Sequence, residues 1–349
     1  MTFYNNRAAI AHINEEELYL FRNINNQIVM DYYNYNEGNI QETIVKDALS
    51  EFDIMINKDN EIYLIYQNIQ NDLCLLTINK KVINNITLNQ EKLPKIFELN
   101  ILESLNHTSI IYLVLQSEKE GIFEIHHHIL NFEDWVNYHV EDIKIDKLLN
   151  PIKILKNKKN IILCYYYENQ ICIKEFNLLS MEWKESIVLT DNKEKLYLDL
   201  LKDGNYTHLI YSEYNNENLR IKYVRHLYDN DSIIKEKEEV LSYEGNPSNS
   251  TLIIEDNIIW AIWNESSNLF SRYSLDRGDT WSSTYIWKES RFVDITRYKY
   301  ITNTIKENII LDYAFGTIYP DIKFLGFGPL NKVEEIIPKK KLMEKILPL

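Results

Sequence analysis

The sequence contains few of the residues that interrupt or cross-link a chain. Glycine accounts for 8 of 349 residues, about 2% against a usual share of about 7%. This low content excludes collagen-like and glycine-linker architectures. Three cysteines are present, Cys74, Cys164 and Cys172, with no C-x-x-C spacing. This odd, scattered set predicts buried thiols rather than a disulfide framework or a zinc knuckle.

Long apolar segments are also missing. Glu15, Glu16 and Glu17 interrupt the only apolar candidate near the N-terminus, so the sequence predicts no signal peptide. No apolar run approaches the roughly 18 residues that a membrane span requires. We therefore expect a cytoplasmic protein without a membrane span. A spore location or release by a non-classical route stays open.

The charge is strongly acidic. Lysine and arginine total 38 and aspartate and glutamate total 52, a net charge of −14. Such a surface repels phosphate backbones, so nucleic acid is not an expected partner. The phosphate-loop, zinc-protease and hydrolase motifs G-x-G-x-x-G, Walker A, H-E-x-x-H and G-x-S-x-G do not occur, and no cofactor is expected.

One apolar, strand-like run recurs through the chain. Its copies include ELYLF, EIYLIY, IIYLVL and IIWAIW, and successive copies lie 44, 49, 50, 46, 52 and 50 residues apart. A fixed period of this length is the signature of a repeat architecture. We align the seven copies on Tyr19, Tyr63, Tyr112, Ile162, His208, Trp260 and Ile310.

Each repeat shows the same internal order of short runs. A first run such as FDIMIN (52–57) precedes the recurrent strand, and a third and often a fourth run follow it. The runs are 5–8 residues long and are separated by Asn, Asp, Gly and Ser, which predicts strands and turns. Asn tolerates left-handed turn positions and can replace the missing Gly there. Four strands in each of seven repeats predict an all-β, seven-bladed β-propeller of four-stranded antiparallel blades, with six blades as the alternative.

A motif in the sixth repeat supports this prediction. Ser274, Asp276, Gly278 and Trp281 occupy the four signature positions of S-x-D-x-G-x-x-W. The segment resembles the Asp-box, or BNR repeat, of the sialidase-like β-propeller superfamily. The resemblance implies a structural hairpin turn between the third and fourth strands of a blade, in which Asp276 accepts N–H bonds and Gly278 has a positive φ. Because Asp-boxes in that family lie away from the active site, the resemblance implies little about substrate.

The same resemblance suggests where an active site would be. The family holds a substrate carboxylate with three arginines, the first in an aromatic-Arg-Ile-Pro segment, and uses a Tyr–Glu pair and an acidic Asp. Arg7 fits the first arginine by position, but the aromatic and the proline are absent, and no other arginine can be assigned. Aromatic platforms for sugars are a further hypothesis, with blade packing as the competing interpretation. The candidate ligand contacts are therefore Arg7, Tyr165, Tyr167 and Trp263.

Three consecutive histidines, His126, His127 and His128, form another distinctive run. On a strand, residues 126 and 128 share one face, so two imidazoles could bind a metal with a third ligand. The sequence names no third ligand. We therefore interpret the run as ordinary third-strand residues and expect no metal site.

The C-terminal residues depart from the strand pattern. In 329–349 the apolar residues recur at helix-like spacing around Pro338, and 339–349 is basic. We predict a propeller over 1–328 and a tail over 329–349, with a helix as one form of the tail, that packs on the protein or mediates self-association. Thr2, Phe3 and Tyr4 are expected to add an outer strand to the last blade.

The function that these patterns favour is non-catalytic. We expect a recognition or scaffold protein that binds a protein or a glycan. The alternative is a carbohydrate-active enzyme, a sialidase-like glycoside hydrolase. An enzyme should gather two arginines or an acid pair at one mouth of the channel, whereas a binder should show an aromatic or mixed patch there.

Overall fold

The short apolar runs form antiparallel strands throughout the part of the chain that the structure describes. This structure is a computed structural model, and it describes residues 8–36, 38–89, 91–105, 107–131, 134–156, 159–229, 232–243, 245–303, 308–319 and 321–336. Within these ranges the chain forms 30 strands and two short 3-10 helices, which confirms an all-β fold. No helix in the described ranges is long and apolar enough to cross a membrane.

The first two repeats supply eight strands in chain order. The first group is β1 (Ala8–Asn14), β2 (Glu17–Ile24), β3 (Gln27–Asn34) and β4 (Gly38–Val45). The second group is β5 (Ala48–Ile56), β6 (Ile62–Asn68), β7 (Leu73–Asn79) and β8 (Lys81–Thr87).

The next three repeats follow the same plan. The third group is β9 (Ile96–Ser104), β10 (His107–Ser117), β11 (Ile122–Asn131) and β12 (Asp134–Lys144). The fourth group is β13 (Ile152–Lys156), β14 (Asn160–Tyr167), β15 (Gln170–Asn177), β16 (Glu182–Trp183) and β17 (Ile187–Val188). The fifth group is β18 (Lys195–Asp203), β19 (Tyr206–Asn215), β20 (Asn218–Asp229) and β21 (Ser232–Val240).

The last strands are shorter and less regular. The sixth group is β22 (Ser248–Glu255), β23 (Ile258–Glu265), β24 (Asn268–Ser274) and β25 (Thr284–Trp287), followed by a 3-10 helix, Lys288–Arg291. The remaining strands are β26 (Thr296–Thr302), β27 (Ile309–Ile310), β28 (Tyr313–Thr317), β29 (Lys323–Leu325) and, after a 3-10 helix at Leu330–Lys332, β30 (Val333–Ile336).

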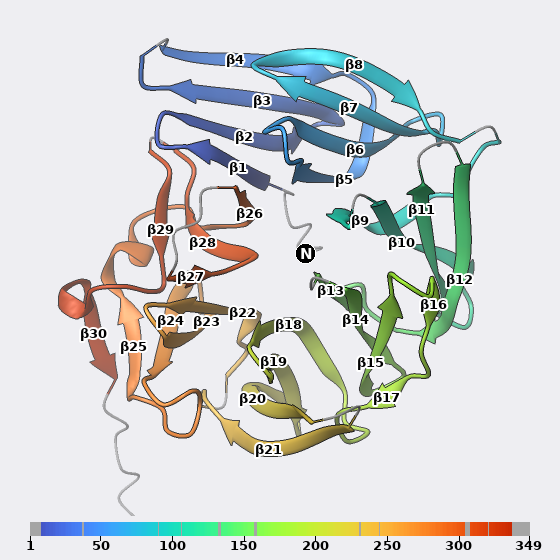
Figure 1. Cartoon of the computed structure of the whole chain (residues 1–349). Helices are drawn as coiled ribbons and strands as arrows, with labels where there is room; N and C mark the ends of the chain where they lie inside the picture. Colours follow the sequence, from blue (N-terminus) through green and yellow to red (C-terminus); the bar gives the residue numbers. More distant parts are fainter. Residues whose placement is uncertain are drawn as a thin grey trace, which may run out of the picture.

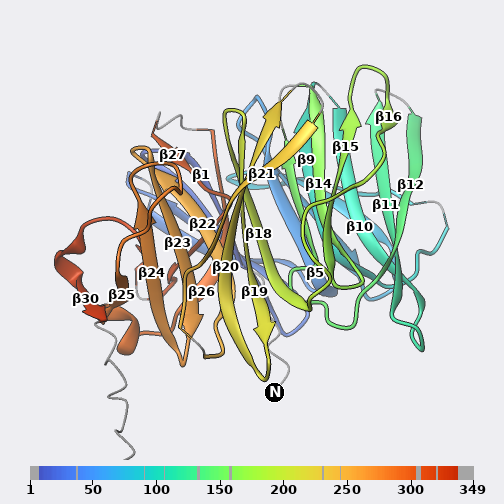
Figure 2. The same cartoon turned by 90° about the horizontal axis from the view of Figure 1, so that it is seen from below.

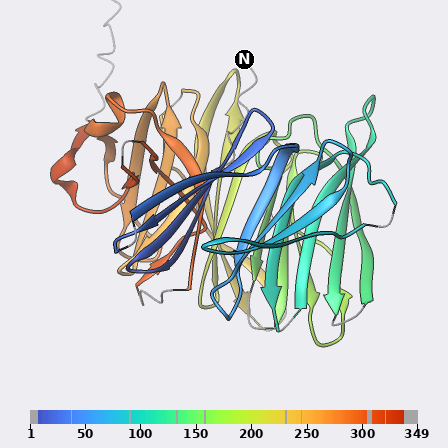
Figure 3. The same cartoon turned by 90° about the horizontal axis from the view of Figure 1, so that it is seen from above.

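The sheets stand in a ring around a central axis, the arrangement of a β-propeller (Figure 1). The first strand of each group, β1, β5, β9, β13, β18, β22 or β26, lies nearest the axis, and the later strands lie progressively further out. Seen from the side, the strands run between two opposite faces of the ring (Figures 2 and 3).

Hydrogen bonding groups these strands into six sheets within the described ranges. Five contain four to six strands, and the sixth has seven strands in the order β29-β28-β26-β1-β2-β3-β4. The extra length arises because β1 pairs with β26 in parallel, from Ala9 opposite Lys299 to His12 opposite Thr302. This pairing joins the two ends of the ring. The expected outer strand at Thr2–Tyr4 lies outside the described residues, and the choice between six and seven blades stays a prediction.

The repeat predicted from the sequence matches the strands at six of its seven anchors. Tyr19, Tyr63, Tyr112 and the next three anchors lie on the second strand of their groups. The anchor Ile310 is wrong, because it lies on β27, which pairs with β22, whereas the partner of β26 is β28. The apolar residues at 309–311 resemble the recurrent strand in sequence, but the strand that pairs with β26 is β28, which begins three residues after Ile310.

The turns use asparagine as predicted. Of the 18 described non-glycine residues with positive φ, eight are asparagines, among them Asn25, Asn60 and Asn257. The polar side chain of Asn can bond the local backbone, which lowers the cost of the left-handed conformation. Tight hairpins thus form in a chain with little glycine.

Aliphatic and aromatic side chains of facing sheets fill the space between them. The largest such cluster joins β11, β14, β15 and β19 through residues that include Ile125, Leu163, Phe176 and Tyr211.

The described part of the predicted tail differs from expectation, because Val333–Ile336 forms a strand paired with β25 rather than a helix. Pairing with an exposed sheet edge satisfies the backbone of this segment. Residues 337–349 lie outside the described residues.

Candidate functional site

Polar residues of the inner strands meet around the central axis. One such residue comes from each of six inner strands, at intervals that follow the repeat: Asp53, Asn100, Lys153, Asp199, Thr251 and Arg297. Elsewhere the same strands carry mainly buried aliphatic side chains. The ring closure therefore places polar groups from distant parts of the chain in one channel.

An ion-pair network occupies this channel. The Nζ of Lys153 lies 2.8 Å from Oδ1 of Asp199 and also contacts Asp312, and Lys153 and Asp199 are almost completely buried. The Nζ of Lys299 lies 2.7 and 2.8 Å from the two oxygens of Asp53. Asp312 comes from the segment between β27 and β28, so this segment inserts into the channel.

The aromatic ring of Tyr313 lies beside the same cations. The guanidinium carbon of Arg297 is 3.9 Å from the ring centroid and the Nζ of Lys153 is 4.6 Å from it. Three cations, from Lys153, Arg297 and Lys299, thus balance the three carboxylates of the network. Paired charges of this kind are tolerated in a buried position, whereas a single unpaired charge is very costly.

The network also shifts the proton equilibria of its members. Burial disfavours the charged form of Lys153, but the carboxylates of Asp199 and Asp312 outweigh it and raise the pKa. Burial likewise opposes the charge of Lys299, and Asp53 and Asp312 reverse the effect, so its pKa is also raised. Burial would raise the pKa of Asp312, but Lys153 and Lys299 hold it below the usual value. The charges of Lys153, Lys299 and Asp312 therefore persist over a wide pH range.

Several of these side chains also fasten neighbouring inner strands together. Oδ2 of Asp53 accepts the N–H of Ile101 at 2.9 Å, one repeat further along the chain. Oδ2 of Asp199 accepts the N–H of Leu252 at the same distance, again in the next repeat. These carboxylates therefore help to hold the ring together.

A pocket, called the larger pocket below, opens at the end of the channel where the inner strands begin. Its volume is about 500 Å³, and it reaches from β1 and β5 across β9 to β18 and β26. It combines cations, carboxylates and aromatic rings: Lys95, Lys147, Arg297, Lys299, Glu51, Asp53, Glu98, Phe52, Phe97, Tyr197 and Tyr313. Among the described lining residues there is one arginine, Arg297, so a three-arginine clamp is not assembled by them.

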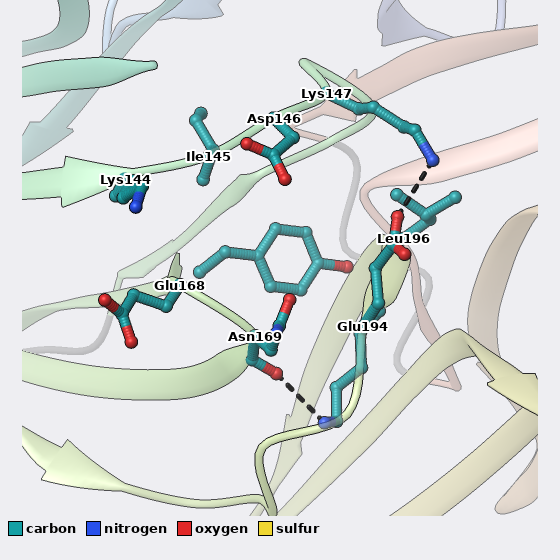
Figure 4. A pocket seen from close by; sticks show the side chains of 10 residues that line it. Lys144, Ile145, Asp146, Lys147, Glu168, Asn169, Glu194 and Leu196 are labelled. Atoms are coloured by element: carbon teal, nitrogen blue, oxygen red, sulfur yellow. Dashed lines mark hydrogen bonds and ion pairs between the residues drawn. The ribbon is translucent and has the colours of Figure 1, made fainter. Parts of the chain in front are cut away.

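A second, smaller pocket of about 270 Å³ adjoins the first along the segment 144–147 (Figure 4). Lys147 lines both pockets, and its Nζ pairs with Oε1 of Glu194 at 2.8 Å. The Nζ of Lys195 donates to the carbonyl oxygen of Asn169 at 3.0 Å and to the carboxylate of Asp191 at 2.9 Å. Lys147, Glu194 and Lys195 of the smaller pocket are thus already paired, and the larger pocket, which also contains several aromatic rings, is the better candidate for a ligand site.

The candidate contacts named from the sequence do not gather in either pocket. Tyr165 is buried between sheets, with its hydroxyl 3.4 Å from Glu141, and Tyr167 is exposed at the end of the same strand. Trp263 is buried in a different sheet, stacked on Phe270. Arg7 lies outside the described residues. Both Tyr165 and Trp263 pack the core, as the competing interpretation held.

The turn at residues 274–281 has a dense local hydrogen-bond pattern. The hydroxyl of Ser274 donates to Oδ1 of Asp276 at 2.8 Å and accepts the N–H of Gly278 at 2.7 Å. The carboxylate of Asp276 accepts both the N–H and the hydroxyl of Thr280, at 2.8 and 2.6 Å. These hydrogen bonds lower the pKa of Asp276 to about 2. The ring of Trp281 is only partly buried.

This turn also connects two sheets. The ring of Trp281 lies edge-on against Tyr223 of β20, with 4.8 Å between centroids. The guanidinium of Arg225 donates to the carbonyl oxygen of Arg277 at 2.7 Å and to Asp279 at 2.8 Å. The turn therefore docks on the neighbouring sheet and lies apart from the residues that line the central pocket.

Sequence reasoning did not find the charged network. The signal was present as polar residues, such as Asp53, Lys153 and Asp199, next to apolar residues of the first strands. Aligned by the repeat, these positions coincide. Asp312 and Tyr313 gave no such signal, because the seventh repeat was aligned on Ile310.

The comparisons with known proteins find only distant similarity. No protein-family profile matches the chain, and no curated protein matches it. Similar solved structures include AofleA from Arthrobotrys oligospora, with 11% identity over 81% of this chain and 86% of that chain and a TM-score of 0.46. The fucose-specific lectin from Aleuria aurantia has 10% identity over 80% of this chain and 95% of that chain, also with a TM-score of 0.46.

A further similar structure is hydrazine synthase from Kuenenia stuttgartiensis, with 12% identity over 78% of this chain and 77% of that chain and a TM-score of 0.48. Because these TM-scores lie below 0.5, none of the three supports an argument about function. The site must be interpreted from its own chemistry.

Proposed function

We propose that the protein is a non-catalytic recognition module that binds a glycan in the pocket at the mouth of the central channel. One observation carries the proposal: a single pocket of about 500 Å³ combines cationic donors, carboxylate acceptors and aromatic rings. Lysine and arginine only donate hydrogen bonds and ionised carboxylates only accept them. A ligand rich in hydroxyl groups, which both donate and accept, satisfies both kinds of group. A simple anion or cation satisfies one kind only.

The rim of the pocket offers groups that the structural network does not use. Lys95 is exposed, and its Nζ lies 5.2 Å from the ring centroid of Phe97. Phe97 is partly exposed and Lys95 lies over its ring, so the two side chains can contact one ligand together. Lys95 directly precedes β9 and Phe97 lies within it, so an inner strand of the ring holds both residues. They are therefore suitable as ligand contacts and as positions for substitution.

The proposed framework is a seven-bladed propeller of the sialidase-like superfamily. Support for seven blades comes from the seven inner strands, with β26, β28 and β29 as a three-stranded last blade. The Ser-Asp-Gly-Trp motif at 274–281 supports the superfamily. A cytoplasmic location, a propeller boundary near residue 328 and self-association through the tail belong to the same proposal.

A carbohydrate-active enzyme is the second candidate, favoured by the three carboxylates of Glu51, Asp53 and Glu98 in the pocket. All three have partners within the chain. Asp53 is bonded to Lys299 and to the N–H of Ile101. Glu51 accepts the N–H of Leu99 at 3.2 Å. Groups committed to backbone bonds are poorly placed to exchange protons with a substrate, which favours binding over hydrolysis.

Binding of the full chain to a panel of immobilised glycans, followed by calorimetry with the best ligand, tests the proposal. Lys95→Ala and Phe97→Ala should each weaken binding at least about tenfold, a loss of about 1.4 kcal/mol. Lys288→Ala, at an exposed lysine distant in sequence, is the matched control and should bind like the parent protein.

Two results would refute the proposal. If no glycan binds, or if both pocket variants bind like the control, the channel-mouth pocket is not a glycan site. Release of free sugar from the bound glycan, abolished by Glu98→Gln, would instead establish the enzyme.

A further inference from the structure

The outer strands of the third sheet carry a cluster of histidines and carboxylates that the proposed function does not use. β11 and β12 form the outermost pair of this sheet, on the rim of the ring (Figure 1). Glu124 and His126 lie two residues apart on β11 and therefore share a face. In the pairing register, Glu124 stands opposite Asp142 and His126 stands opposite His139.

A β-bulge brings the two β12 residues together. His139 and Asp142 are three residues apart, which in a regular strand would put their side chains on opposite faces. The register shifts between the pairs that Ile125 and His126 make with β12, so that β12 contains one additional residue there. A bulge of this kind redirects side chains. His139 and Asp142 consequently point to the same side as Glu124 and His126.

The four side chains form two bonded pairs that lie side by side. The Nε2 of His126 lies 2.9 Å from Oε2 of Glu124, and the Nε2 of His139 lies 2.7 Å from Oδ1 of Asp142. One ligand atom from each of Glu124, His139 and Asp142 lies within 4.8 Å of the others. Glu124 and Asp142 are like charges directly opposite one another, an arrangement that is unfavourable unless a cation lies between them.

Neighbouring residues hold part of the cluster in position. The ring of His126 stacks on Tyr112 with 5.7 Å between centroids. Oε1 of Glu124 accepts an N–H of Gln116 at 3.0 Å, which leaves Oε2 directed toward His126. Fixed orientation of ligand side chains by such partners strengthens metal sites. His139 and Asp142 are about half exposed, so an ion can reach them from solvent.

We propose that Glu124, His126, His139 and Asp142 bind one divalent transition-metal ion, with zinc as the best fit. Zinc accepts both imidazole nitrogens and carboxylate oxygens as ligands and is usually four-coordinate in proteins. Imidazole favours zinc, nickel and copper, whereas calcium and magnesium prefer sites made of oxygen alone. Bonds of about 2.0–2.2 Å require the ligand atoms to approach by small rotations of exposed side chains. The ion would replace the protons now shared between each histidine and its carboxylate, and would fasten β12 to β11.

Calorimetric titration of zinc into untagged, chelator-treated full-length protein tests the site. The expected result is one ion per chain, with affinity for zinc at least tenfold greater than for calcium. Cobalt should give the visible absorption of a four- or five-coordinate site. His139→Gln should weaken zinc binding at least tenfold without changing the thermal stability of the metal-free protein, because this side chain is exposed.

His128→Gln is the matched control. His128 lies on the same strand and face, but its ring contacts the Tyr112 hydroxyl at 2.7 Å and Asn137 rather than a carboxylate. This variant should bind zinc within about twofold of the parent protein. The proposal is wrong if zinc does not bind at one ion per chain, if calcium binds as tightly, or if His128→Gln and His139→Gln lose affinity equally.

Discussion

Replacing Lys153 with methionine isolates the charge of the central network from its packing. Methionine keeps an unbranched apolar chain of similar length and removes the ammonium. The side chain of Lys153 is 5% exposed and that of Asp199, 2.8 Å from its Nζ, is 1% exposed. After the substitution, two cations face the three carboxylates of Asp53, Asp199 and Asp312. One buried negative charge then has no counter-charge.

The expected loss is large because the environment is dry. Removing one partner of a buried ion pair typically costs about 3–5 kcal/mol. A second substitution, Asp312→Asn, restores the balance at two cations and two carboxylates. The double variant should therefore be more stable than the sum of the single effects predicts, by at least about 1 kcal/mol. A purely steric defect at Lys153 would give additive effects instead.

Urea denaturation provides the measurement, followed by far-ultraviolet circular dichroism and by the fluorescence of the six tryptophans. The denaturation midpoint should fall while its dependence on urea concentration stays constant. Lys288→Met, at an exposed lysine, should change the free energy of unfolding by less than about 0.5 kcal/mol. A loss below about 1 kcal/mol in Lys153→Met, or additive single effects, would refute the coupled network.

Three further predictions concern other parts of the ring. The pKa of buried His127 is lowered to about 3, chiefly by burial and also by His128, whereas the unfolded chain binds this proton near pH 6.5. The free energy of unfolding should therefore decrease as the pH falls below 6.5. In the variant His127→Leu, the melting temperature should decrease less steeply over the same pH range. Gly278→Ala should lower the free energy of unfolding by more than about 1 kcal/mol, since its φ is +88° and an ideal Cβ would lie 2.0 Å from the Tyr223 hydroxyl oxygen; an unchanged urea midpoint would contradict this. Deleting 331–349 removes the edge strand β30, so circular dichroism should keep its β signature with a small loss of melting temperature, and failure to fold would show that the tail completes the ring.

The repeat and the class of fold were predictable because they depend on local patterns. Strand-length apolar runs, polar turns and a period near 48 residues are properties of neighbouring residues, and six of the seven anchors lie on the expected strands. The seventh anchor, Ile310, is wrong, because it lies on β27, which pairs with β22. The family resemblance rests on the eight residues 274–281, and the resemblance itself stays a prediction.

The candidate sites depended on contacts that sequence patterns do not contain. The histidine run drew attention to His126, but its companion His139 became apparent only through the register and the bulge of β12. For the aromatic residues Tyr165 and Trp263 the sequence offered both binding and packing, and it favoured packing. Burial between sheets decided in favour of packing for both.

The sequence by itself determined that this chain forms repeated antiparallel strands, because alternation of apolar and polar residues and Asn-rich turns act over a few residues. Only the tertiary structure decided which polar residues meet. Lys299 bonds Asp53 across 246 positions of sequence, and Asp312 joins Lys153 across 159. Such pairs form because ring closure brings the two ends of the chain together, and a buried charge is stable only beside its counter-charge. The chemistry of the channel is therefore a consequence of closure.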